Sequence, residues 1–219
     1  MFRIKICGIT TIDDGQAAMA AGADAIGLNF YRSSPRYVEL TTAKQIRAAL
    51  PAEMTVVGLF VNAPTDEVRR IWDELGLSLI QLHGDESPEY LAELAPRPIM
   101  RALRVSVGGL PAVRDYLARC QQLGCSPRRL LWDSLVGGSY GGSGMTSDWD
   151  AAADYTRQRA TPPLVLAGGL NPENVAQAIY TVRPHAVDTA SGVESSPGRK
   201  SPAKLVAFVR AAQSAFATV

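Results

Sequence analysis

Eight times along this chain a short apolar run is followed by a stretch with helical periodicity, and no other feature limits the possible folds as strongly. The apolar runs read RIKICG, AIGLNF, TVVGLFV, LIQLHG, PIMRALRV, RLLWDS, LVLAGG and AVDTASG. The helical stretches cover residues 11–21, 42–50, 64–75, 88–94, 110–123, 148–159, 172–182 and 202–216. Strands and helices that alternate in this way are typical of βα units, in which helices cover a parallel sheet.

These units predict a closed (β/α)8 barrel, and 219 residues is near the compact end of the usual size range for that fold. An open, doubly wound sheet is the structural alternative. Such a sheet binds dinucleotides through Gly-x-Gly-x-x-Gly after its first strand, and this chain has no such motif there. No linker rich in Pro, Ser and Gly interrupts the alternation, so we expect residues 1–219 to form a single domain.

The composition predicts a globular protein whose partners are small molecules. The chain is 47% hydrophobic with 22 basic and 21 acidic residues, so it has no charge bias towards nucleic acid or a membrane surface. The sequence shows no signal peptide and no run that would span a bilayer, which predicts a cytoplasmic location. Three cysteines and two histidines without ligand spacing argue against a metal or disulfide framework, and Cys120 and Cys125 are interpreted as packing residues.

Several of the apolar runs end in a side chain that can do chemistry. These residues are Cys7, Asn29, His83, Asp133 and Asp188. Because the carboxyl ends of barrel strands meet at one rim, we expect them around one site. His83 points into that site if Gln81 does, although a core histidine with satisfied hydrogen bonds is the alternative interpretation.

The first strand predicts a thiol at the mouth of the barrel. Alternation directs Ile4 and Ile6 towards the helices, and Lys5 and Cys7 inwards. A neighbouring ammonium such as that of Lys5 favours the thiolate, which can act as a base or a nucleophile. A buried structural cysteine is the alternative, since free cysteine is among the most buried residue types.

The sixth strand offers an acid to partner this thiol. Alternation turns Leu131 and Asp133 inwards and Leu130 and Trp132 towards the helices. A cysteine base and an aspartic acid on opposite sides of one pocket can move protons in both directions, as an isomerase requires. Alternatively, Asp133 only caps the turn that follows.

Two turns with glycine indicate a phosphorylated ligand. The seventh strand ends at Gly168 and Gly169, and the eighth ends at Ser191 and Gly192. Barrels often bind phosphate between these two loops through backbone N–H groups and a short helix. Glycine pairs also occur where a tight turn needs them, so a purely structural role for these glycines is the alternative interpretation.

The segment SLVGGSYGGSGMTS follows Asp133 and contains five glycines. It is too long for a minimal βα turn and too rich in glycine to be rigid, which predicts a mobile lid over the phosphate end of the site. A disordered insertion is the alternative.

Six segments carry a resemblance to a known family. They are KICGIT (5–10), NFYRSSPRYV (29–38), VGLFVN (57–62), QLHGDE (81–86), LAGGLNPENV (166–175) and VDTASGVESSPGRKS (187–201). Through them the chain closely resembles the phosphoribosylanthranilate isomerases of tryptophan biosynthesis, nearly from end to end. The resemblance implies a (β/α)8 barrel and an Amadori rearrangement without a metal or an organic cofactor.

The resemblance also implies a role for each site residue. Asp133 corresponds to the acid that protonates the furanose ring oxygen and opens the ring to a Schiff base. Cys7 then removes the C2′ proton to give an enolamine, which tautomerises to the ketone. Arg36 matches the arginine proposed to bind the anthranilate carboxylate, and His83 and Asp188 are interpreted as residues that orient the substrate.

Two departures from the common family pattern affect the anion site. Met145 stands where many relatives have lysine, and the eighth strand reads VDTASGVE in place of VDVSSGVE. Ser191 and Gly192 are retained, so the phosphate prediction stands without the loop lysine. A two-phosphate barrel of histidine biosynthesis is an alternative, but VGLFVNAP has no second glycine pair. A barrel that binds phosphometabolites without catalysis is another, against which the pair of Cys7 and Asp133 argues.

Overall fold

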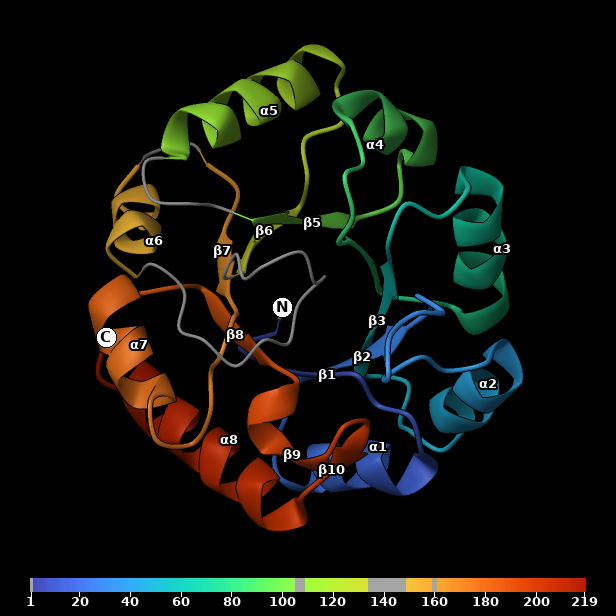
Figure 1. The fold of residues 1–219 in the computed structure, drawn as a ribbon, viewed down its shortest axis with the longest axis vertical. Coiled ribbons are helices and arrows are strands. Elements are labelled where there is room, and N and C mark those ends of the chain that lie inside the picture. The colour runs from blue at the N-terminus through green and yellow to red at the C-terminus, as the bar shows by residue number, and fades with distance from the viewer. Residues whose placement is uncertain (1, 105–108, 134–148, 159–160) are drawn as a thin grey trace.

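The structure is a computed structural model that describes residues 2–104, 109–133, 149–158 and 161–219. Its parallel strands form a closed barrel in which each strand pairs with the next and β8 pairs with β1 (Figure 1). The strands are β1 Ile4–Cys7, β2 Ala25–Asn29, β3 Thr55–Phe60, β4 Leu79–Leu82, β5 Ile99–Arg104, β6 Arg129–Asp133, β7 Leu164–Leu166 and β8 Ala186–Thr189. The predicted (β/α)8 barrel is confirmed, and the open sheet is excluded.

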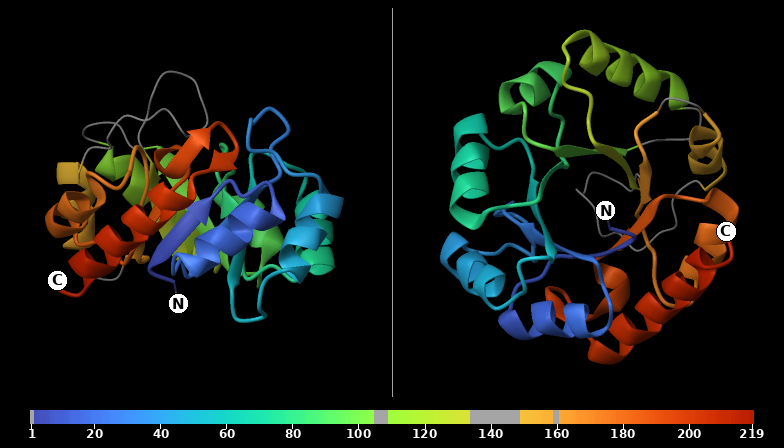
Figure 2. Two further views of the ribbon diagram at one scale, coloured as in Figure 1. Left: turned by 90° about the horizontal axis from the view of Figure 1, so that it is seen from below. Right: turned by 180° about the vertical axis from the view of Figure 1, so that it is seen from behind.

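Helices surround the barrel on its outer face (Figure 2). They are α1 Ile12–Ala20, α2 Leu40–Ala48, α3 Thr65–Leu75, α4 Pro88–Leu94, α5 Leu110–Gln122, α6 Trp149–Thr156, α7 Val175–Val182 and α8 Pro202–Phe216. Helix α7 begins at Val175 rather than at Pro172, because Asn171 Oδ1 accepts the backbone N–H groups of Glu173 and Asn174 and forms a turn instead. No helix within the described ranges combines the length and the apolar character needed to cross a membrane.

Side chains alternate along the strands between two apolar clusters. The inner cluster fills the barrel and contains Phe2, Ala25, Val57, Leu79, Met100, Ala102, Leu131, Val165, Ala167 and Ala186. The outer cluster joins the strands to the helices and includes Ile4, Ile6, Leu130 and Trp132. These are the orientations predicted for β1 and β6. They leave Cys7 and Asp133 on the inner side, at the carboxyl ends of their strands.

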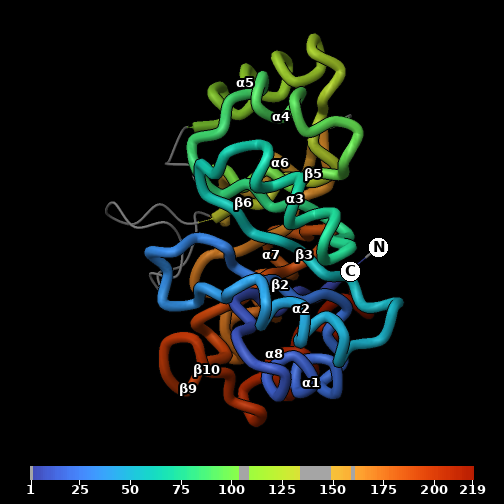
Figure 3. Tube along the Cα trace, turned by 90° about the vertical axis from the view of Figure 1, so that its right-hand side faces the viewer, coloured from blue at the N-terminus to red at the C-terminus, as the bar shows by residue number. Residues whose placement is uncertain are grey.

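The segment between β8 and α8 contains structure that the periodicity did not predict. It forms the 3-10 turn η1 Ser191–Val193, followed by an antiparallel hairpin of β9 Glu194–Ser196 and β10 Arg199–Lys200. Figure 3 shows this hairpin on the same side of the barrel as the loop after β2, opposite the N-terminal end. The hairpin therefore lies beside the mouth where the candidate site is found.

Candidate active site

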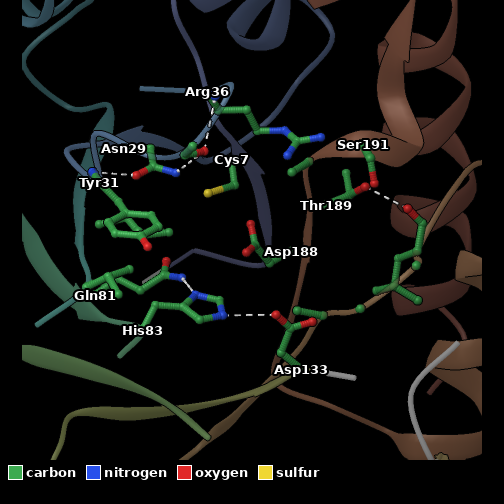
Figure 4. Close-up of a pocket in the computed structure, with 18 residues that line it drawn as sticks. Cys7, Asn29, Tyr31, Arg36, Gln81, His83, Asp133, Asp188, Thr189 and Ser191 are labelled. Atoms are coloured by element: carbon green, nitrogen blue, oxygen red, sulfur yellow. Dashed lines mark hydrogen bonds and ion pairs between the residues drawn. The ribbon is translucent and has the colours of Figure 1, made fainter. Parts of the chain in front are cut away.

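A cavity opens at the carboxyl ends of the strands, where TIM barrels carry their active sites (Figure 4). It holds about 680 Å³ of empty space, including the part open to solvent, which suits a small-molecule ligand. The predicted site residues in its wall are Cys7, Arg36, His83, Asp133, Gly168, Gly169, Asp188 and Ser191. Other polar or aromatic residues in the wall are Asn29, Tyr31, Ser34, Gln81 and Thr189. The structure thus brings together residues from strands that are far apart in the sequence.

Cys7 ends β1 beside a buried ion pair. The Lys5 side chain is fully buried, and its Nζ donates to Asp188 Oδ1 across 2.9 Å. The register between β1 and β8 sets these two residues opposite each other. Gly27 in β2 provides the necessary space, since a Cβ there would lie 2.8 Å from Cys7 Sγ and 3.1 Å from Lys5 Nζ. The thiol and the ammonium therefore occupy neighbouring positions at the base of the cavity.

This ion pair sets the charge around the thiol. Burial alone would lower the pKa of Lys5, but Asp188 and Cys7 outweigh it, and the pKa is raised. Burial raises the pKa of the Cys7 thiol, and Lys5 only partly offsets this. Lys5 therefore favours the thiolate as predicted, but burial is the larger effect. Burial and the ammonium of Lys5 thus act on the thiol in opposite directions.

Asp133 ends β6 and is hydrogen-bonded to His83, which in turn is hydrogen-bonded to Gln81 of β4. His83 Nε2 lies 3.0 Å from Asp133 Oδ2, and His83 Nδ1 lies 2.9 Å from Gln81 Nε2. An amide nitrogen can only donate, so Nδ1 accepts from Gln81, and Nε2 is the ring nitrogen that donates to the carboxyl. His83 therefore donates to the carboxyl of Asp133. The histidine has hydrogen-bond partners at both ring nitrogens, as a core histidine would, and it also lines the cavity. Its side chain therefore points into the site, as expected if Gln81 does.

Arg36 reaches the cavity from the loop between β2 and α2. Asn29 shapes this loop, because its Oδ1 accepts the Tyr31 N–H at 2.9 Å and its Nδ2 donates to Ser34 Oγ at 3.0 Å. Ser34 Oγ also accepts the backbone N–H of Arg36. The guanidinium of Arg36 donates from Nε and Nη2 to the two carboxylate oxygens of Glu194, each across 2.8 Å. Arg36 is thus an oriented, paired cation rather than a solvated loop charge.

The turns after β7 and β8 lie against each other. Gly168 and Gly169 have φ values of 86° and 68°, in the region that favours glycine. A Cβ on Gly192 would collide with the carbonyl oxygen of Leu170, so this glycine lets the second turn pack on the first. Ser191 lines the cavity, whereas Gly192 does not form part of its wall. The glycines therefore do serve tight packing, and the phosphate site between the turns remains a prediction.

Sequence reasoning missed two charged residues of the hairpin. Lys200 Nζ donates to Glu194 Oε1 across 2.8 Å and to the Ala190 carbonyl across 3.0 Å. The signal for this hairpin was the turn dipeptide Pro197–Gly198 between two short polar runs. Met145 and the glycine-rich segment 134–147, predicted as a lid, lie outside the described residues.

The barrel and its mouth define a TIM-barrel enzyme with a thiol and a carboxyl that can transfer protons. In the described part of the chain, no group of His, Cys, Asp and Glu side chains is arranged to hold a metal ion. A family model described as N-(5'phosphoribosyl)anthranilate (PRA) isomerase matches residues 4–211. The chain belongs to this family.

Relatives of known sequence and structure match over nearly the whole chain. The N-(5'-phosphoribosyl)anthranilate isomerase of Bordetella avium is 47% identical over 208 residues, covering 95% of this chain and 94% of the relative. The crystal structure of phosphoribosyl anthranilate isomerase from Thermotoga maritima has a TM-score of 0.86 at 35% identity, covering 98% and 100%. A structure in complex with reduced 1-(o-carboxyphenylamino)-1-deoxyribulose 5-phosphate has a TM-score of 0.83 at 34% identity, with the same coverage. Family membership excludes the two alternatives, a barrel of histidine biosynthesis and a non-catalytic binder.

Proposed function

We propose that this isomerase converts N-(5′-phosphoribosyl)anthranilate into 1-(2-carboxyphenylamino)-1-deoxyribulose 5-phosphate, in tryptophan biosynthesis, with Cys7 and Asp133 as its proton-transfer residues. The observation that carries the assignment is that β1 and β6 place a thiol and a carboxyl in the wall of one cavity. In Figure 4 the two side chains extend into this cavity from different sides. An acid and a base are the two groups that the rearrangement needs.

Asp133 acts first, as the general acid. Its protonated carboxyl donates to the furanose ring oxygen while the C1′–O bond breaks, and the nitrogen lone pair completes a Schiff base at C1′. The hydrogen bond from His83 to Oδ2, with a length of 3.0 Å, fixes the carboxyl group for this transfer.

Cys7 acts second, as the general base. Its thiolate takes the proton from C2′, and the electron pair of that C–H bond moves into the Schiff base to leave an enolamine. The enolamine gains a proton at C1′ and loses the proton of its C2′ hydroxyl, which yields the ketone. The ammonium of Lys5 stabilises the thiolate in this step, because it is buried beside the sulfur and keeps its charge.

Two further contacts place the substrate. We assign the phosphate to the paired turns at Gly168–Gly169 and Ser191–Gly192, where backbone N–H groups are the donors. We assign the anthranilate carboxylate to Arg36, whose planar guanidinium suits a carboxylate, and the orientation of the sugar to Asp188 and His83. The reduced product that is bound in a family structure carries both a phosphate and a carboxylate.

The test follows the fluorescence of N-(5′-phosphoribosyl)anthranilate as the purified enzyme consumes it. Inorganic phosphate should compete with the substrate. Gly169→Val should weaken binding severely because it obstructs the turn, whereas Ser191→Ala is the matched control and should cost little, since backbone donors remain. If the fluorescence did not change, the substrate assignment would be wrong. If Gly169→Val bound substrate normally, only the phosphate assignment would be lost.

A further inference from the structure

A bidentate ion pair at the mouth joins Arg36 to a residue that does not itself line the cavity. Arg36 is in the cavity wall, and Glu194 of β9 lies behind it with only 5% of its side chain exposed. The two hydrogen bonds between them are both 2.8 Å long and use the Nε edge of the guanidinium. Bidentate pairs of this kind fix the plane of the guanidinium as well as its position.

The stem of Arg36 is fixed as well. It crosses the turn after β1 at Gly8, where an added Cβ would lie 3.1 Å from the Cβ and Cγ atoms of Arg36. Gly8 has a φ of 72°, so the turn itself requires glycine. The side chain is therefore held at both ends, by close packing on Gly8 and by the carboxylate of Glu194.

The pairing leaves part of the guanidinium for a ligand. Of the five N–H donors of an arginine, the contact with Glu194 uses one on Nε and one on Nη2. One N–H group of Nη1 and the second of Nη2 form the adjacent, end-on edge, and the other N–H group of Nη1 lies on the Cδ side. A carboxylate can bind this edge in a second bidentate pair, provided that the guanidinium keeps its plane.

The local charge balance agrees with an anionic ligand. Glu194 bonds to two cations, Arg36 and Lys200, so the cluster of three carries a net positive charge. Burial would raise the pKa of Glu194, but the contacts with Arg36 and Lys200 outweigh it and lower the pKa. The carboxylate therefore stays ionised, and the charge left over favours a negative group at the mouth.

We propose that Glu194 is a positioning residue for substrate recognition: it holds the Nε edge of Arg36 so that the end-on edge meets the carboxylate of the anthranilate ring. This inference rests on the assignment of that carboxylate to Arg36 made above. It predicts that Glu194 contributes to the choice of substrate without touching it, and that its contribution disappears for ligands that lack the carboxylate.

The experiment measures the affinities of two probes for the full-length enzyme. One is reduced 1-(o-carboxyphenylamino)-1-deoxyribulose 5-phosphate, and the other is the same compound with phenyl in place of carboxyphenyl. Glu194→Gln should weaken binding of the first probe by about tenfold, the scale of one charge-assisted hydrogen bond, and leave the second unchanged. KM should rise accordingly while kcat changes little.

Two further variants separate this role from a structural one. Glu194→Gln/Lys200→Met removes one negative and one positive charge, so it keeps the net charge of the cluster and should show the same selective loss. Lys204→Met is the matched control, because Lys204 Nζ donates to the backbone carbonyl of Glu194 and not to its carboxylate, and it should bind both probes as wild type does. Arg36→Met should abolish the preference for the carboxylated probe.

Each outcome decides between separate claims. Equal weakening of both probes by Glu194→Gln would make Glu194 a structural support of the hairpin. Unchanged or tighter binding of the carboxylated probe would show that Glu194 competes with the ligand for Arg36, and either result overturns the proposal. If Arg36→Met kept the preference for the carboxylated probe, the assignment of Arg36 would fail, and the role of Glu194 with it. If Glu194→Gln left the affinities of both probes unchanged while Arg36→Met abolished the preference, the proposal for Glu194 would fail and the assignment of Arg36 would stand.

Discussion

The two sides of the active site hold the residues proposed for proton transfer in different ways. On the base side, β1 and β8 bring Cys7 next to a buried ion pair of Lys5 and Asp188. On the acid side, Asp133 accepts a hydrogen bond from a histidine whose tautomer is fixed by Gln81. A full charge acts on the thiol, whereas an oriented hydrogen-bond donor acts on the carboxyl.

The difference follows from what each group has to become. A buried thiol must lose its proton to work, and a nearby cation is the means by which a protein stabilises a thiolate. A general acid has to give up its proton in a set direction, and a hydrogen bond to one oxygen sets the orientation of the carboxyl. Removing the cation beside Cys7 is therefore expected to move the pH at which activity rises, whereas removing His83 is expected to lower the rate without moving it.

The largest effect should come from removing the base itself. Cys7→Ser should lower kcat by about 1,000-fold, since general-base catalysis contributes roughly 100- to 10,000-fold and a hydroxyl does not ionise near neutral pH. Binding of the reduced product should be retained, as calorimetry can show. Turnover within about tenfold of wild type would remove Cys7 from the base role.

Replacing the acid, Asp133, on the other side of the cavity should also lower kcat. Asp133→Asn keeps the shape of the side chain but cannot supply the proton, so kcat should fall by at least about 100-fold. Single-turnover measurements with N-(5′-phosphoribosyl)anthranilate isolate the chemical step. A normal rate in that step would mean that another residue protonates the ring oxygen.

The barrel was predictable from the sequence because strands and helices each impose a period. The same alternation placed Ile4 and Leu130 outside and Cys7 and Asp133 inside, as observed. The hairpin of β9 and β10 was not predicted, since it has no apolar period. It is held by buried charges, chiefly Glu194 with its two cations, and charges at such spacing also occur on solvated loops.

The position of site residues was more predictable than their partners. Strand ends in a barrel converge whatever the sequence, so Cys7, His83 and Asp133 could be assigned to one rim. Their contacts depend on register and side-chain reach. Arg36 and Glu194 are separated by 158 positions and meet only through the loop after β2 and the hairpin after β8, which neither local sequence reveals.

His83 tests the contrast between the two sides, because it is expected to affect the orientation of Asp133 and not the pH at which activity rises. His83→Leu removes the donor to Asp133, and kcat should fall by about tenfold, the value of one hydrogen bond that orients the acid. His83→Gln can place an amide N–H near the position of Nε2 and should recover much of that loss. The pH at which activity rises should not change in either variant. A shift in that pH would show that His83 acts through charge, which would break the contrast between the two sides.

The smallest expected change is a shift of the pH profile, which should follow from removing the ion pair behind Cys7 as a unit. Lys5→Met/Asp188→Leu puts apolar side chains of similar size in place of the pair, so no buried charge is left without its partner. Lys5 lowers the pKa of Cys7 and Asp188 raises it, and the effect of Lys5 is the larger, so the pKa of the thiol should rise further when both are removed. Because kcat/KM increases as the base of the free enzyme loses its proton, the rise in the pH profile should move to higher pH. Loss of the sugar contact assigned to Asp188 should lower the rate at every pH, so the position of the rise, and not the rate itself, is the measurement. Ile6→Val, which changes an outward-facing neighbour in β1, is the control and should leave the profile in place. If the profile of the double variant also stayed in place, the ion pair would only fill the barrel, and if it moved to lower pH, Asp188 rather than Lys5 would dominate the thiol.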